Sequence, residues 1–494
     1  MKINQKQLQT ISLFSGALGL DLGLEKAGFR TAVAVECDRH AADTVKLNHP
    51  KLPLLQSRIE DLSTKEILAA AKLKVGEAAV VVGGPSCQAF STAGQRGSLG
   101  DPRGELFRHF IRIVEEAQPR FFIMENVRGL LSAAIKHRSL KERGPGYPSL
   151  APEEMLGSAL EVVISELKQT GYYVTFELMN AADYGVSQVR HRLVFIGSRD
   201  GETVAMPRKT HSQSGGKGMK PWQTLRQTLK GLDDKKPEFS KFSDSRLKYL
   251  NHISEGGNWR DLPDDLKEAA LGKAYVSWGG RSGFLRRLSW DKPSPALTTQ
   301  PDGKATMLCH PTELRPLSVR EYARIQQFAD EWQFVGSLRR KYIQLGNAVP
   351  VGLGLAIGKA LMETIKFRKH CNKSKLGKVE CFDVDLLSKL SQRPATIVNP
   401  PRMRETDCVK KLATWYDETP RLRASVLKYA APEIKDALAT TLAEKKRKKS
   451  GKKAAVKKDP GKKVRKPIQT LPKAAIKSRL KHGGRTKPRA ASGR

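Results

Sequence analysis

The chain has 494 residues, a formal net charge of +38 at pH 7 and 39% hydrophobic residues, which fits a protein of several domains with a polyanionic partner. No apolar run reaches the length of a membrane span, and the N-terminus lacks the apolar core of a signal peptide. The six cysteines form no Cys-x-x-Cys pair, so we expect no metal site, no disulfide framework and a reducing, cytoplasmic compartment.

The positive charge is unevenly spread along the chain. Residues 442–494 contain 21 lysines and arginines against Glu444 and Asp459, so this tail contributes +19, half of the total. Its Lys/Pro/Ala-rich composition predicts disorder. The rest of the chain is basic as well, which predicts a polyanionic partner, although a feature that only improves solubility is the alternative here too. Since no spanning segment is expected, no membrane partner is expected. A tail that only improves solubility fits the same composition.

Up to residue 200, short apolar segments alternate with amphipathic ones. Strands are expected at 10–14, 31–36, 78–84, 120–127, 172–180 and 192–197, and helices at 20–28, 38–49, 104–117 and 155–171. Asp38 is a candidate N-cap of the second helix. This alternation requires right-handed crossovers and predicts a doubly wound, mostly parallel α/β sheet with both faces covered.

The pattern changes after this alternating region. Residues 198–285 are rich in Gly, Lys, Ser, Asp and Trp with weak periodicity, which predicts a separate, loop-rich module. Patterned sequence resumes at 285–299, and 348–365 predicts a final helix. A segment around 405–441 is expected to be partly helical.

Two local patterns point to a site at one edge of the predicted sheet. A strand ends in "VVVGGPSCQAF" (80–90), which presents Cys87 on a glycine-flanked loop, where a cysteine can act as a nucleophile or pack as a small hydrophobe. In "FSGALGLDLG" (14–23), Gly16 precedes Glu36 by 20 residues, a spacing seen in nucleotide sites. The glycines do not follow Gly-x-Gly-x-x-Gly, so a tight turn beside a solvated glutamate fits equally well.

Seven motifs, in order, resemble those of prokaryotic DNA (cytosine-5)-methyltransferases over residues 10–365. They are "ISLFSGALGLDLGLEKAGF" (11–29), "GGPSCQAFSTAGQRG" (83–97), "DPRGELF" (101–107), "FIMENVRGL" (122–130), "MNAADYGVSQVRHRLVFIG" (179–197), "RRLSWDKPSPALTT" (286–299) and "QLGNAVPVGLGLAIG" (344–358). The resemblance implies a Rossmann-like methyltransferase fold. The domains it implies are a discontinuous catalytic domain at 1–200 and 286–365, a target-recognition domain at 201–285, an extension at 366–441 and the tail at 442–494.

In this family a cysteine thiolate adds to C6 of a cytosine flipped out of the duplex, and C5 then accepts a methyl group from S-adenosylmethionine. The resemblance assigns the nucleophile to Cys87. Glu125 would bind the N3/N4 edge of the base. Arg192 would contact its O2, and Arg190 would support the catalytic loop or bind phosphates. A surface glutamate and ordinary salt bridges are the alternatives for these three residues.

For the cofactor, the resemblance points to residues on both sides of the recognition module. They are Phe14, Gly16, Gly19, Glu36, Ile59, Leu106 and Asn347. Phe14 and Ile59 would sandwich the adenine, and Asn347 would complete the pocket from the C-terminal motif.

Three positions depart from the family pattern. Leu18 stands where glycine is frequent, and Ser86 replaces the proline that usually precedes the nucleophile. Arg58 replaces an acid that often contacts adenine, a contact that Glu60 or Asp61 could supply instead.

DNA contacts are expected from Gln88, Ser91, Gln95, Arg96 and Gln188. The first four belong to a loop suited to closing over a flipped base, although a merely flexible loop fits as well. Within 201–285, no pattern identifies which residue reads which base.

The expected activity is methylation of cytosine C5 in a short duplex DNA sequence, by a monomer in the nucleoid-associated cytoplasm. Protection of host DNA in a restriction or phage-defence system, with its partner proteins, is the leading expectation. A solitary regulatory methyltransferase, a tRNA cytosine methyltransferase and an inactive DNA-binding protein are the alternatives. The intact Cys87, Glu125 and 188–192 set argues against the last.

Overall fold

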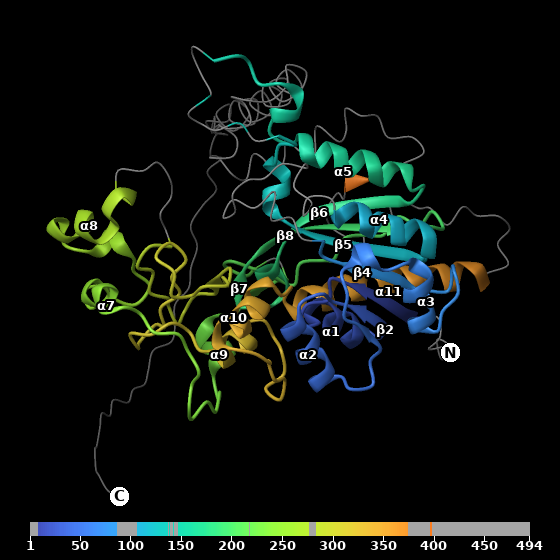
Figure 1. Ribbon diagram of the computed structural model, residues 1–494. Coiled ribbons are helices and arrows are strands. Elements are labelled where there is room, and N and C mark those ends of the chain that lie inside the picture. The colour runs from blue at the N-terminus through green and yellow to red at the C-terminus, as the bar shows by residue number, and fades with distance from the viewer. Residues whose placement is uncertain are drawn as a thin grey trace, which may run out of the picture. The chain divides into compact units, whose positions relative to one another are not determined.

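A single large sheet organises the computed structural model, which describes residues 8–85, 106–136, 138, 142, 147–216, 218–275, 283–373 and 396–397. The strand order is β12-β6-β8-β5-β4-β1-β2-β3 (Figure 1). The strands are β1 (Gln9–Leu13), β2 (Arg30–Val35), β3 (Leu54–Leu55), β4 (Val80–Gly83), β5 (Phe121–Val127), β6 (Tyr173–Asn180), β8 (His191–Ser198) and β12 (Thr396–Ile397). β1 to β6 run in one direction and β8 and β12 run in the other, which confirms the predicted mostly parallel sheet.

The six predicted strands are confirmed, with ends that differ by at most two residues from the observed ones. The four further two-residue strands lie outside the large sheet and were not predicted, because two residues are too few to show a period. They pair as β7 (Gln188–Val189) with β11 (Ser294–Pro295), and as β9 (His211–Ser212) with β10 (Lys220–Pro221).

Helices cover both faces of the sheet (Figure 1). They are α1 (Gly19–Lys26), α2 (Arg39–Asn48), α3 (Thr64–Ala71), α4 (Leu106–Ala117), α5 (Ser158–Gln169), α6 (Leu225–Leu229), α7 (Asp244–Leu250), α8 (Asp264–Leu271), α9 (Val319–Ile325), α10 (Leu338–Asn347) and α11 (Val351–Lys373). The predicted helices correspond to α1, α2, α4, α5 and α11. Asp38 caps α2 as predicted, since its carboxylate accepts the Ala41 N–H at 3.0 Å.

Alternation along β4 divides the core into two layers. Val81 packs in a cluster with side chains of α3, α4 and α5, whereas Val80 and Val82 pack in a second cluster with α1 and α11. Successive residues of a strand point to opposite faces. Both faces are therefore buried, which explains the unbroken "VVV" run.

Helix α11 packs directly on α1, although more than 300 residues separate them in sequence (Figure 1). A Cβ atom on Gly23 would lie 2.3 Å from the Val351 carbonyl oxygen, and one on Gly354 would lie 2.5 Å from that of Leu20. Only glycine permits backbones to approach this closely. The C-terminal motif is thereby fixed beside the first turn of the chain.

The expectation that no stretch has the length and apolarity of a membrane span needs a correction. The helical stretch Leu338–Lys366 has both, with a mean hydropathy of 1.4 in its most apolar window. However, 61% of that window is buried inside the protein. Its apolar character is that of a core helix, because Leu353, Ile357 and Leu361 pack in the cluster that covers the sheet.

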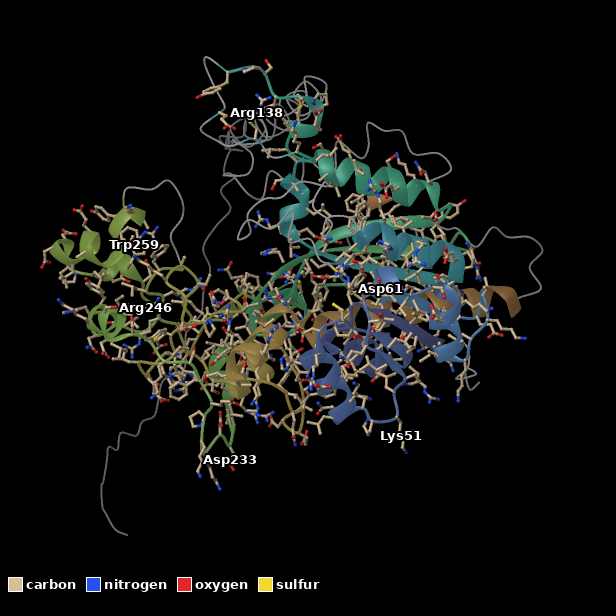
Figure 2. The ribbon with its side chains drawn as sticks, viewed as in Figure 1. Lys51, Asp61, Arg138, Asp233, Arg246 and Trp259 are labelled. Atoms are coloured by element: carbon tan, nitrogen blue, oxygen red, sulfur yellow. The ribbon has the colours of Figure 1, made fainter. Side chains whose placement is uncertain are left out.

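A small second core lies in the lobe formed by α7 and α8, where Figure 2 labels Arg246 and Trp259. Phe242, Leu250 and Trp259 pack there with Met307 and Cys309. The last two residues follow the predicted recognition module in sequence, so this core draws on both segments.

Candidate active site

The carboxyl ends of β1, β2, β4 and β5 lie next to one another at one edge of the sheet (Figure 1). The chain order reverses between β1 and β4, because β2 and β3 continue on one side and β4 and β5 on the other. Ligands of doubly wound sheets bind at such a switch point.

The turn after β1 is held by the carboxylate of Glu36, at the end of β2. Its Oε2 accepts the Gly16 N–H at 2.7 Å and its Oε1 accepts the Asp38 N–H at 2.7 Å. Burial raises the pKa of Glu36, and these two N–H donors act against that rise. Gly16 has φ +53°, and within the described part of the chain no heavy atom beyond Gly16 and its two chain neighbours lies within 4 Å of the position its Cβ would take. The turn is therefore open beside a fixed carboxylate.

Leu18 has φ 65°, in the left-handed region that favours glycine. This conformation costs a leucine about 1–2 kcal/mol. The side chain is 1% exposed and packs in an apolar cluster, and this burial offsets the cost. Gly19 has a different constraint, because its Cβ would lie 2.3 Å from the Val349 carbonyl oxygen. Close packing against the 348–350 segment thus accounts for glycine at position 19.

Three of the predicted cofactor residues, Phe14, Ile59 and Leu106, belong to one hydrophobic cluster. Ile59 begins the short 3₁₀ turn η2 (Ile59–Asp61). On α4, Arg112 donates to the carbonyl oxygens of Ile59 at 3.2 Å and Leu62 at 3.0 Å. The turn is therefore anchored to the helix that Leu106 opens.

Arg58 and Asn347, the other two positions that the family resemblance connects with the cofactor, are polar. Arg58 pairs with Glu60 at 2.8 Å, so the arginine that departs from the family pattern neutralises the neighbouring acid. Asn347 ends α10 with an exposed side chain. It lies two residues from Val349, whose carbonyl oxygen faces Gly19.

Glu125 of β5 lies beside the end of β4, the strand that precedes Cys87 in the sequence. Gly83 pairs with Met124 across β4 and β5, and a Cβ on Gly84 would lie 2.7 Å from Glu125 Oε2. The Oε1 atom forms an ion pair with Arg192 Nε, and both side chains are 12% exposed. Arg192 comes from β8, opposite Val127 of β5. A carboxylate and a guanidinium thus meet beside the end of β4.

Gln188 and Arg190 are buried, which corrects the expected DNA contact of Gln188 and the phosphate alternative for Arg190. Gln188 is 0% exposed, and its amide bonds Gln326 at 3.1 Å and the Leu297 N–H at 3.0 Å, so it is not placed to contact DNA. Arg190 is 3% exposed and donates to the carbonyl oxygens of Leu297 at 3.0 Å and Gly346 at 2.6 Å. Burial lowers its pKa, with neighbouring Arg192 acting in the same direction. Arg190 supports the protein backbone and does not face a phosphate.

The remaining predicted residues are outside the part of the chain that the structure describes. They are Ser86, Cys87, Gln88, Ser91, Gln95 and Arg96.

The profile of the family described as C-5 cytosine-specific DNA methylase matches residues 8–363. The chain belongs to this family. The Type II methyltransferase M.Sau96I of Staphylococcus aureus is 38% identical over 361 residues, which cover 72% of this chain and 76% of that protein. M.Eco47II of Escherichia coli is 36% identical over 381 residues, covering 74% and 81%. A crystal structure titled as a putative DNA modification methyltransferase encoded within an E. coli prophage is 26% identical, covers 73% of this chain and 99% of that chain, and has a TM-score of 0.49.

This C-5 methylase is therefore a DNA (cytosine-5)-methyltransferase with DNA as substrate and S-adenosylmethionine as methyl donor. The described residues fit that cofactor. Glu36 is a carboxylate acceptor suited to ribose hydroxyls, and the space over Gly16 is open. The cluster of Phe14, Ile59 and Leu106 suits an apolar ring. Within the described ranges, the Ser15 hydroxyl is buried without a hydrogen-bond partner, so it can bond a ligand at this turn.

Sequence reasoning missed one titratable group of the methylase at this edge. Asp21 is 3% exposed in the first turn of α1. Burial raises its pKa to about 7, while a hydrogen bond with Ser12 acts in the opposite direction. The available signal was an acid between Leu20 and Leu22 in a short apolar helix. Arg112 and Gln326 have no such local signal, because their partners are distant in sequence.

Proposed function

We propose that this methylase acts on a cytosine flipped out of a short duplex sequence, through a bond between Cys87 Sγ and C6. The thiolate forms the S–C6 bond, and the electron pair of the C5–C6 double bond makes C5 nucleophilic. The Glu125 carboxyl group supports protonation of N3 as negative charge builds on the ring, and that proton leaves N3 again when the thiolate is expelled; Arg192 contacts O2. S-adenosylmethionine, when bound, supplies the methyl group as an electrophile. Water then takes the C5 proton, the S–C6 bond breaks, and the thiolate leaves.

One observation supports this assignment above the others. The Glu125 carboxylate, paired with Arg192, lies against Gly84, three residues before Cys87. A side chain at position 87 can therefore approach a base that Glu125 binds. The carboxylate and the guanidinium offer an acceptor and a donor to the polar edge of cytosine.

The test is covalent trapping with random-sequence duplex DNA that contains 5-fluorocytosine, in the presence of S-adenosylmethionine. Fluorine cannot leave C5 as a proton does, so the S–C6 bond persists and mass spectrometry should find DNA on Cys87. Cys87→Ala should give no adduct. Glu125→Gln should form the adduct at least 100-fold more slowly. An adduct-free wild type would refute the mechanism.

The same proposal divides the chain into a catalytic domain from 1–200 and 286–365 and a recognition domain at 201–285. It adds an extension at 366–441 and a basic tail at 442–494. The packing of α11 on α1 supports the discontinuous catalytic domain. The core around Trp259 supports a recognition domain, and because it includes Met307 and Cys309, this domain also draws on residues after 285.

The biological role proposed is protection of host DNA, because the relatives at 38% and 36% identity are named Type II methyltransferases. The enzyme would act as a cytoplasmic, nucleoid-associated monomer beside a restriction or defence protein. Bisulfite sequencing of host DNA with and without the gene gives activity and target sequence together. Methylation of tRNA in place of duplex DNA, or survival of the host without a cognate restriction activity, would favour the RNA-modifying or solitary alternatives.

A further inference from the structure

Gln326 occupies a buried junction that no part of the proposed reaction uses. It directly follows α9 and is 0% exposed. Its Nε2 donates to the carbonyl oxygens of Leu345 at 2.5 Å and Ala348 at 3.2 Å. Its Oε1 accepts from Gln188 Nε2 at 3.1 Å. One amide therefore joins the turn that contains Asn347 to strand β7.

Arg190, which directly follows β7, adds further hydrogen bonds to this junction. Its guanidinium donates to the Gly346 carbonyl oxygen at 2.6 Å and to Gln188 Oε1 at 3.4 Å. The carbonyl groups of residues 345, 346 and 348 are thus all bonded to buried side chains. These groups flank Asn347, whose own side chain stays exposed.

Strand β7 is followed closely in sequence by Arg192, the residue that the proposed function places at the target base. Gln188 and Arg190 precede Arg192 by four and two residues, and Arg192 pairs with Glu125. The Glu125–Arg192 ion pair is therefore connected through the covalent backbone of 188–192 to Gln188, and Gln188 is hydrogen-bonded through Gln326 to the turn at Asn347. Buried hydrogen bonds of this kind are costly to leave unmade, so the two ends are held in one register.

We propose that Gln326 is a positioning residue that couples occupancy of the base site to cofactor binding. The inference rests on the proposed function, because it takes Arg192 and Asn347 as the ends of the two sites. Coupling between two binding sites is reciprocal. The bound DNA should therefore raise the affinity for S-adenosylmethionine by the same factor as the cofactor raises the affinity for DNA.

The test measures by calorimetry, in the full chain, the Kd of S-adenosylhomocysteine, which is the cofactor without its transferable methyl group, alone and with saturating unmethylated random-sequence duplex DNA. Gln326→Met keeps the side-chain length but leaves the carbonyl oxygens of Leu345 and Ala348 unbonded. It should raise the Kd without DNA about tenfold and abolish the effect of DNA. Gln188→Met removes the hydrogen bond to Gln326 and the acceptor of Arg190 and of the Leu297 N–H, but it leaves the bonds of Gln326 to Leu345 and Ala348 in place. It should keep the Kd without DNA within twofold of wild type and still abolish the effect of DNA.

Gln344→Met is the matched control, since this buried amide donates to Val335 and not to the Asn347 turn. It should resemble wild type in both Kd values. Wild-type coupling retained in Gln188→Met would overturn the inference, even if Gln326→Met failed to fold. A wild type whose cofactor affinity ignores DNA would overturn it as well. A wild type that neither binds the cofactor nor methylates DNA would instead refute the proposed function.

Discussion

Individual residues at the edge of the sheet are chosen by what lies directly beside them. Gly84 has no side chain because the Glu125 carboxylate occupies that space, and Gly19 has none because of Val349. Leu18 shows the opposite case, since its burial maintains a backbone conformation that favours glycine. The residue type at each of these positions is thus determined by the groups packed beside it. A sequence motif alone does not identify those groups.

Replacing Asp21 by asparagine should change the pH dependence of stability. The folded-state pKa of about 7 exceeds the ordinary value of 3.8, so the folded protein holds this proton more tightly. The associated stability is complete below pH 3.8 and is lost as the pH rises towards 7, by up to about 4 kcal/mol. Asp21→Asn should therefore raise the free energy of unfolding at pH 8 and leave it almost unchanged at pH 4. Urea denaturation at both pH values measures this, with exposed Asp265→Asn as control; equal gains at both would contradict it.

Gly84→Ala should impair catalysis more than folding. The new methyl group would lie 2.7 Å from Glu125 Oε2 and displace that carboxylate from the base-binding position. We expect about a 100-fold lower kcat, because small misplacements of catalytic groups have effects of this size. The Tm and the Kd for S-adenosylmethionine should stay close to wild type. A variant with unchanged kcat would show that the position of Glu125 is not critical.

Individual site residues were only partly predictable from the sequence. Glu36 follows β2, Gly16 lies in the turn after β1 and Glu125 lies in the second half of β5, where local pattern and motif agree. Gln188 belongs to the same motif as Arg192, yet it turns inward, because its partners Leu297 and Gln326 come from segments more than 100 residues away. No local pattern contains that information.

Among the elements, those with a full hydrophobic period were predictable and the short ones were not. β4 and β5 are buried along most of their length and α4 buries one face, so their sequence patterns clearly predict two strands and a helix. Helix α9 has seven residues and β7 has two, so their positions depend on tertiary contacts. The hydrogen bonds of Gln326 lie next to these short elements. No local sequence pattern therefore predicts this buried junction.

The α1–α11 contact can be tested at Gly354. A methyl group there would meet the Leu20 carbonyl oxygen, which cannot rotate away as a side chain can. Gly354→Ala should lower the free energy of unfolding by about 3 kcal/mol, because the helices must separate. Chemical denaturation measures the change. Lys359→Ala, on the exposed face of the same helix, should have little effect; similar losses in both variants would argue against close packing as the cause.

The whole molecule combines a patterned catalytic body with a strongly charged C-terminus. Half of the net charge of +38 belongs to residues 442–494, outside the matched family region of 8–363. Charge of this kind acts on DNA phosphates without regard to sequence. Target choice and chemistry should therefore reside in the body, and salt-sensitive affinity should depend on the tail.

Truncation after residue 441 tests this division. The shortened enzyme should methylate the same sequence with a similar kcat. Its affinity for DNA should fall, and log Kd should depend less steeply on log salt concentration, because fewer counterions are released on binding. Filter binding across a salt series measures the slope. An unchanged slope would mean that the tail makes no phosphate contacts.

The packing of α11 on α1 also has a consequence for how the protein is made. Leu20 and Leu24 of α1 leave the ribosome early, whereas Leu353, Ile357 and Leu361, which cover them, are synthesised more than 300 residues later. At bacterial elongation rates this interval lasts roughly 20–60 s. During that time the nascent chain exposes an apolar helix face, and the contact between α1 and α11 can form only after residues 353–361 have been synthesised.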